Sequence, residues 1–257
     1  MNFIVYLIFG LVPSIIWLLF YLRKDHHPEP KGQVIRIFFF GMIITLPTIL
    51  IERILLEAIT KFEPLLSGNL FSFLYFFGGV ALVEEVLKYL VVKETILKDP
   101  DFDEPIDAML YMIIAALGLA AIENILVLYT LKEPLFIQQA TLTMSARFIG
   151  ATFLHALCSG LIGYFLARSF FESENKKRLM LIGFIIATAL HGLFNVSIIK
   201  IGETLIEKNG KILIINPQGL YFAFATVASI LIGLAIFVSW GLNNLKKIES
   251  ICKIKQK

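Results

Sequence analysis

Long apolar runs separated by short polar segments dominate the pattern of the chain. Seven such runs cover approximately residues 2–22, 34–57, 70–92, 106–131, 139–168, 178–200 and 218–242. Each is close to or above the roughly 20 residues that an α-helix needs to cross a bilayer. The pattern therefore predicts an all-α, polytopic bundle of about seven transmembrane helices, within a range of six to eight.

Composition agrees with this prediction. Of the 257 residues, 58% are hydrophobic and 17% are charged, and the mean hydropathy is +0.81. No linker or low-complexity segment divides the chain, so residues 1–257 are expected to form a single membrane domain. The first apolar run lacks a preceding positive charge and is long enough to span, which predicts a first transmembrane helix rather than a cleavable signal peptide.

Lysine and arginine are unevenly distributed between the two sides of the predicted bundle. The segments after the first, third and fifth runs, together with the C-terminal tail, hold fifteen of the 23, whereas the opposite side holds six. Because cytoplasmic loops carry an excess of Lys and Arg, a multi-pass cell-membrane protein is expected, with the N-terminus outside and Cys252 in the cytoplasm. The net charge of +3, spread over loops and tail, predicts no nucleic-acid partner.

Charged residues interrupt the third apolar run. Its sequence over 78–92, GGVALVEEVLKYLVV, contains Glu84, Glu85 and Lys88. A charge inside a membrane helix costs about 3 kcal/mol on insertion scales, so such residues usually have a function. The structural explanation is an ion pair between Glu84 and Lys88, which are four residues apart. Glu85 would point about 100° away on the helix and would lack a local partner.

Three further runs carry polar residues in apolar surroundings. They are Glu123 and Asn124 in the fourth run, Arg147 and His155 in the fifth, and His191 and Asn195 in the sixth. Taken singly, each has a structural explanation: Asn195 bridging helices, for example, or Arg147 neutralising Glu123. The structural reading is weaker for the whole set, because carboxylates, imidazoles, amides and cations are concentrated in four successive helices.

The rise of an α-helix predicts that several of these groups share one layer. At 1.5 Å per residue, His155 and His191 lie about 20 Å from the cytoplasmic ends of their helices, and Glu84 lies about 12–20 Å from its own. A layer of carboxylates and imidazoles can hold a water molecule and remove its proton. The pattern therefore indicates a general-base site.

Several motifs occur in a recognisable order. They are PEP at 28–30, EEVLK at 84–88, IEN at 122–124, Arg147 with His155, and HGLFN at 191–195. With this set the chain resembles the PrsW family of glutamic-type intramembrane proteases, related to the CAAX prenyl protease and bacteriocin-processing (CPBP) group. The resemblance covers about residues 25–200. It implies hydrolysis of a peptide bond in a membrane-associated protein, with an anti-sigma factor as a candidate substrate.

The resemblance also implies roles for individual residues. It assigns Glu84, Glu85, His155, His191 and Asn195 to the catalytic motifs, with Lys88, Glu123, Asn124 and Arg147 in support. The related prenyl proteases have Phe four residues before the first motif histidine, where this chain has Ala151, so no prenylated substrate is expected. The expected partners are a single-span membrane protein substrate and the lipid bilayer, and the oligomeric state stays open.

Other functions remain open at this level. Glu84 or Glu85 with His155 and His191 is a suitable ligand set for zinc, which would make the protein a zinc-dependent metalloprotease of the same fold. Because Lys88 lies one turn from Glu84 and repels a dication, catalysis without a metal or other cofactor is favoured. A proton-coupled transporter also needs buried Glu, His and Arg, although no inverted repeat is visible. A non-catalytic membrane scaffold is the last alternative.

Overall fold

The computed structural model describes residues 3–25, 28–97, 99, 102–131, 136–171, 175–208 and 211–248, so Cys252 lies outside it. Its helices are α1 (Phe3–Leu22), α2 (Lys31–Thr60), η1 (Glu63–Leu65), α3 (Gly68–Phe73), η2 (Leu74–Ala81), α4 (Leu82–Thr95), α5 (Pro105–Leu128), α6 (Phe136–Ile149), α7 (Ala151–Phe171), α8 (Lys176–Glu203) and α9 (Pro217–Leu245). Within these residues, seven helical spans are long and apolar enough to cross a membrane, which confirms the predicted helical bundle. The protein is a multi-pass membrane protein.

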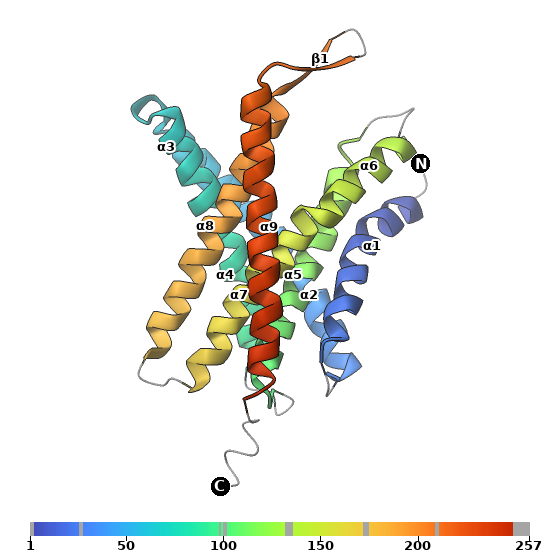
Figure 1. The fold of residues 1–257 in the computed structure, drawn as a ribbon, viewed down its shortest axis with the longest axis vertical. Helices are drawn as coiled ribbons and strands as arrows, with labels where there is room; N and C mark the ends of the chain where they lie inside the picture. Colours follow the sequence, from blue (N-terminus) through green and yellow to red (C-terminus); the bar gives the residue numbers. More distant parts are fainter. Residues whose placement is uncertain are drawn as a thin grey trace.

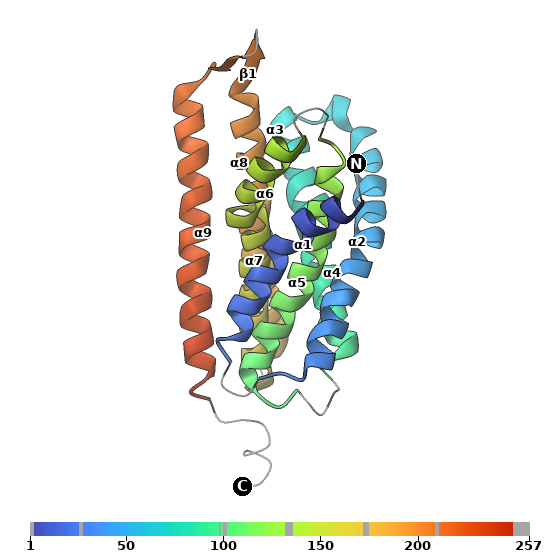
Figure 2. The same cartoon turned by 90° about the vertical axis from the view of Figure 1, so that its right-hand side faces the viewer.

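Helix α5 forms the centre of the bundle. In the apolar stretch of α5, 78% of the residues are buried, against 22–28% in the corresponding stretches of α1, α2, α8 and α9. Helices α1, α2 and α7 pack against it, while α8 and α9 pack on α7 (Figures 1 and 2). A helix that is apolar on all sides belongs in the interior of a bundle, and α5 has this composition over most of its length.

Two glycines hold α2 against α5. A Cβ atom added to Gly118 would overlap the carbonyl oxygen of Phe38, and one added to Gly41 would overlap that of Ala115. Small residues allow membrane helices to approach until their backbones touch. This contact fixes α2 beside the helix that carries Glu123.

Two of the predicted spans are interrupted. The third consists of α3, a π-helical segment (η2) and α4, and the π-helix ends at Ala81, three residues before Glu84. The fifth is divided at Gly150 into α6 and α7, and the indole of Trp17 donates a hydrogen bond to the carbonyl of Phe148 at 2.8 Å. Helix irregularities of this kind are frequent at functional sites.

A short β-hairpin follows α8, which the sequence analysis did not anticipate. Strands β1 (Leu205–Lys208) and β2 (Lys211–Ile214) pair antiparallel, with Leu205 opposite Ile214. The hairpin extends from the end of the bundle at which α1 begins, and α9 ends at the opposite side (Figure 1). The signal in the sequence is the Asn209-Gly210 pair between two apolar segments, a pattern typical of hairpins.

Candidate active site

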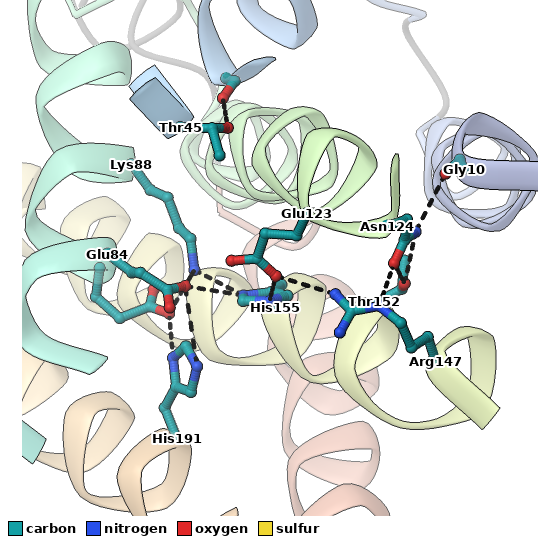
Figure 3. A network of polar contacts seen from close by, with 12 residues as sticks. Gly10, Thr45, Glu84, Lys88, Glu123, Asn124, Arg147, Thr152, His155 and His191 are labelled. Carbon is teal, nitrogen blue, oxygen red and sulfur yellow. Dashed lines mark hydrogen bonds and ion pairs between the residues drawn. The ribbon is translucent and has the colours of Figure 1, made fainter. Parts of the chain in front are cut away.

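Four helices bring the candidate residues into one polar cluster inside the bundle. Helix α4 supplies Glu84, Glu85 and Lys88, α5 supplies Glu123, α7 supplies His155 and α8 supplies His191 (Figure 3). Apart from Glu123, which is half-buried, each of these residues is at most 4% exposed. The groups that the helical rise placed in one layer are therefore in contact.

Lys88 lies at the centre of the cluster. Its Nζ atom is 3.2 Å from Glu84 Oε2, 2.9 Å from Glu85 Oε1 and 2.9 Å from His155 Nδ1. The expectation that Glu85 lacks a local partner is wrong, because Glu85 is three residues before Lys88 and the long lysine side chain reaches both carboxylates. All three ammonium hydrogens thus have acceptors.

The partners of His155 define its protonation. An ammonium group is only a donor, so His155 Nδ1 accepts from Lys88. The other nitrogen, Nε2, is 3.0 Å from Glu123 Oε2, and a carboxylate accepts, so Nε2 carries the hydrogen. His155 is thereby assigned as a neutral imidazole whose two nitrogens are both engaged.

The two nitrogens of His191 have different surroundings. Its Nδ1 is 3.0 Å from Glu85 Oε1 and donates to that carboxylate. Its Nε2 faces Glu84 and is 3.9 Å from Oε2, which exceeds hydrogen-bonding distance. Within the described residues, Nε2 of His191 is the imidazole nitrogen of the cluster that has no hydrogen bond.

The two glutamates have different surroundings. Glu85 is fully buried and accepts from Lys88, from His191 and, at 2.9 Å, from the hydroxyl of Ser159. Glu84 is 4% exposed and makes the longer contacts, including 3.3 Å from Oε2 to His155 Nδ1. Glu85 is therefore held by more and shorter contacts than Glu84.

The supporting residues form a hydrogen-bonded chain of side chains that leads away from the cluster. Glu123 pairs with Arg147 at 3.0 Å, as the sequence suggested, and the Nε atom of Arg147 donates to Asn124 Oδ1. The amide nitrogen of Asn124 then donates to the carbonyl of Gly10 and to the hydroxyl of Thr152, each at 3.2 Å (Figure 3). This chain ties α1, α5, α6 and α7 together and orients Glu123 toward His155.

Asn195 is separate from this network. It lies on α8 one turn after His191 and is half-buried. Its side chain makes no hydrogen bond with another residue that the structure describes. The amide is therefore free to donate to a ligand.

Two residues of the network were not identified from the sequence as site residues. They are Ser159, which donates to Glu85, and Thr152, which accepts from Asn124. Isolated hydroxyls inside apolar runs are common in packed membrane helices. Their position relative to Glu85 and Asn124 follows only from the tertiary structure.

Glu29 of the PEP motif lies away from the cluster, between α1 and α2. The hydroxyl of Tyr111 donates to its carboxylate. Burial raises the pKa of Glu29, and the nearby charges of Asp25 and Asp103 add to this effect, against hydrogen bonds with Asp107 and Tyr111. Glu29 thus joins the start of α5 to the chain that enters α2, and it is not part of the polar cluster.

The ligand set fits a metal ion in most respects. Glu84, His155 and His191 each offer one ligand atom, and these atoms lie within 4.8 Å of one another. Both histidines also bond through their other nitrogen to a carboxylate, as metal-bound histidines do. Against this, the ammonium of Lys88 contacts both Glu84 Oε2 and His155 Nδ1. Zinc would fit this set once Lys88 moved away or lost a proton.

The fold and the site together define a multi-pass helical membrane protein with a buried carboxylate–imidazole centre. The family model described as "PrsW family intramembrane metalloprotease" matches residues 29–232. The chain belongs to the PrsW family, as its motifs predicted.

Several curated proteins are similar over most of the chain. Protease PrsW of Geobacillus kaustophilus is 28% identical over 187 residues, which cover 72% of this chain and 76% of that protein. Protease PrsW of Bacillus subtilis is 27% identical over 188 residues, covering 72% and 79%. Protease PrsW of Clostridioides difficile is 26% identical over 193 residues, covering 72% and 76%. No solved structure matches the chain.

Proposed function

We propose that this protein is an intramembrane peptidase that hydrolyses a peptide bond of a single-span membrane protein, with Glu84 as the general base. The observation that carries the proposal is the position of Glu84 Oε2, 3.3 Å from His155 Nδ1 and 3.9 Å from His191 Nε2. Membership of the PrsW family, whose curated relatives are named proteases, supports the same reaction. An anti-sigma factor is the candidate substrate.

The proposed reaction begins with a water molecule held by Glu84 and by Nε2 of His191. Glu84 takes a proton from the water as the oxygen attacks the carbonyl carbon of the scissile bond. The amide of Asn195 donates to the oxyanion of the tetrahedral intermediate. Glu84 then returns its proton to the leaving nitrogen as the C–N bond breaks.

The other cluster residues position these groups. Lys88 pairs with Glu84 at 3.2 Å, so its positive charge compensates the carboxylate inside the apolar layer. Glu85 fixes the orientation of His191 through Nδ1, which leaves Nε2 directed at Glu84. His155 joins Lys88 to Glu123, so the α4 and α5 carboxylates keep a fixed separation.

The second candidate is a zinc-dependent peptidase at the same site. Two observations favour it. Nε2 of His155 and Nδ1 of His191 each bond to a carboxylate, as in metal-bound histidines, and the matching family is described as a metalloprotease family. Glu84, His155 and His191 would hold the ion. Bound zinc would activate water and polarise the carbonyl oxygen. We favour the metal-free reaction because Lys88 already places a cation against two of these three residues.

The experiment that tests the proposal is a cleavage assay in proteoliposomes that contain single-span membrane proteins, anti-sigma factors included. Wild-type protein should release a product that the Glu84→Gln variant does not release. Glu57→Gln is the matched control, since Glu57 is exposed and pairs with Arg53 on the surface of α2. Equal cleavage by wild type and Glu84→Gln would contradict the proposal, and no cleavage of any substrate would favour a transporter or scaffold.

We also propose the orientation that the distribution of Lys and Arg predicts. The N-terminus and the hairpin would lie outside the cell, and Cys252 would lie in the cytoplasm. A membrane-impermeant thiol reagent should then label Cys252 only after permeabilisation, with Cys252→Ser as the control, since Cys158 is buried. Labelling of Cys252 in intact cells would reverse the assignment.

A further inference from the structure

One carboxylate beside the cluster has no role in the reaction above. The buried face of α2 is formed by Val34, Ile37, Gly41, Thr45 and Thr48. These positions recur every three or four residues, and the next position on the same face is Glu52. Glu52 is half-buried, whereas its neighbour Arg53 is exposed and pairs with Glu57 at 3.3 Å. Glu52 therefore faces the interior, and the adjacent cation points away from it.

Glu52 borders the polar cluster on the side of α2 and η2. Its carboxylate is close enough to Glu84, Glu123 and Lys88 to interact with them electrostatically, and it interacts in the same way with Tyr75 of η2. Two turns further along α2, Ile59 also faces η2, because a Cβ atom added to Gly79 would lie 3.9 Å from Ile59 Cδ1. Glu52 thus lies where α2 passes η2, the segment that leads into the helix of Glu84 and Glu85.

Among the described residues, both cations of this layer are engaged by groups other than Glu52. The layer contains the carboxylates Glu52, Glu84, Glu85 and Glu123 and the cations Lys88 and Arg147. Lys88 is occupied by two carboxylates and His155, and Arg147 by Glu123 and Asn124. Within the described part of the chain, Glu52 makes no hydrogen bond and no ion pair. A carboxylate at membrane depth is costly unless a partner compensates its charge.

We propose that Glu52 is a specificity-determining residue whose carboxylate binds a Lys or Arg side chain of the substrate near the scissile bond. The inference rests on the proposed peptidase function. A basic side chain would pair with Glu52 and reduce the excess of carboxylates over cations in the layer. An acidic side chain at the same substrate position would add a like charge, and such substrates are rejected.

A substrate series in proteoliposomes tests this inference. Each residue on either side of the cleavage site is changed in turn to Lys, Gln or Glu, and kcat/KM is measured for wild type, Glu52→Gln and Glu52→Lys. Wild type should cleave the Lys substrate about tenfold faster than the Gln substrate at one position, and the Glu substrate slowest. In Glu52→Gln this ratio should fall to about one, and in Glu52→Lys the order should invert. Glu57→Gln should keep the wild-type ratio.

Two results would overturn the inference while leaving the peptidase intact. The first is that wild-type enzyme cleaves all substrates without a preference for Lys at any position, a result that is measured with wild-type protein alone. The other is a Glu52→Gln protein whose rates fall equally for every substrate, since that marks a structural or proton-transfer role. Absence of any cleavage by wild type would instead contradict the proposed function, and this inference with it.

Discussion

Lys88 and His155 are joined by a 2.9 Å contact between Nζ and Nδ1 in a layer where neither residue is more than 3% exposed. Because an ammonium group only donates, this contact assigns the hydrogen of His155 to Nε2. Both nitrogens of His155 are then engaged, whereas Nε2 of His191 makes no hydrogen bond with another described residue. The packing of α4 against α7 thus distinguishes the two histidines.

Substitution of Glu84 and of Glu85 should affect protein stability differently. Both Glu84→Gln and Glu85→Gln should lower the rate of cleavage by about 10²-fold or more, the first by removing the base and the second by releasing His191 and Lys88. Glu85→Gln should also destabilise the protein by about 1–3 kcal/mol, since Glu85 has three buried partners. Thermal unfolding in detergent measures the difference, and equal destabilisation by Glu84→Gln would assign Glu84 a structural role.

Exchanging Glu123 and Arg147 should not restore activity. The double variant Glu123→Arg/Arg147→Glu keeps an ion pair, but it removes the acceptor for His155 Nε2 and the donor to Asn124. Cleavage should therefore stay near the level of the single variants, whereas Arg147→Lys, which keeps the charge, should be less impaired. Recovery in the exchanged protein would mean that mutual neutralisation is the whole function of the pair.

The hydrophobic pattern was sufficient to predict the seven spans, and the helical rise was sufficient to predict that His155, His191 and Glu84 share a layer. Both follow from local geometry. The contact of Lys88 with Glu85 did not follow, because a flexible lysine chooses among acceptors that the tertiary structure supplies. The π-helix before α4 and the break at Gly150 also depend on packing between helices.

Glu52 illustrates the same limit. In the sequence it stands next to Arg53 near the end of an apolar run, and the pattern alone does not show which of the two side chains is buried. Only the buried face of α2 shows that Glu52 and Arg53 point in different directions. The distinction requires knowing which side of the helix the bundle covers.

Glu29 should make stability depend on pH. Since burial raises its pKa in the folded protein, the protonated form is favoured by folding. The contribution of protonated Glu29 to the free energy of unfolding is complete below the ordinary pKa of glutamate. It is lost as pH rises through the raised pKa of the folded protein. Glu29→Gln should therefore be more stable than wild type at the upper end of this window, with a smaller difference below it. Unfolding measured across pH, with exposed Glu94→Gln as control, checks this, and parallel curves for wild type and Glu29→Gln would refute it.

The last prediction concerns the metal. If Lys88, and not a metal ion, supplies the positive charge of the cluster, wild type should keep cleaving after extended treatment with a strong membrane-permeant chelator. It should also contain well under one zinc ion per chain. Lys88→Met should lose cleavage, because Glu84 and Glu85 lose their counter-charge, and added zinc should not restore it. Lys93→Met, on the exposed face of the same helix, should behave as wild type. The zinc-dependent reaction predicts the reverse: chelation stops wild type, zinc restores it, and Lys88→Met binds zinc more tightly because the competing ammonium is gone.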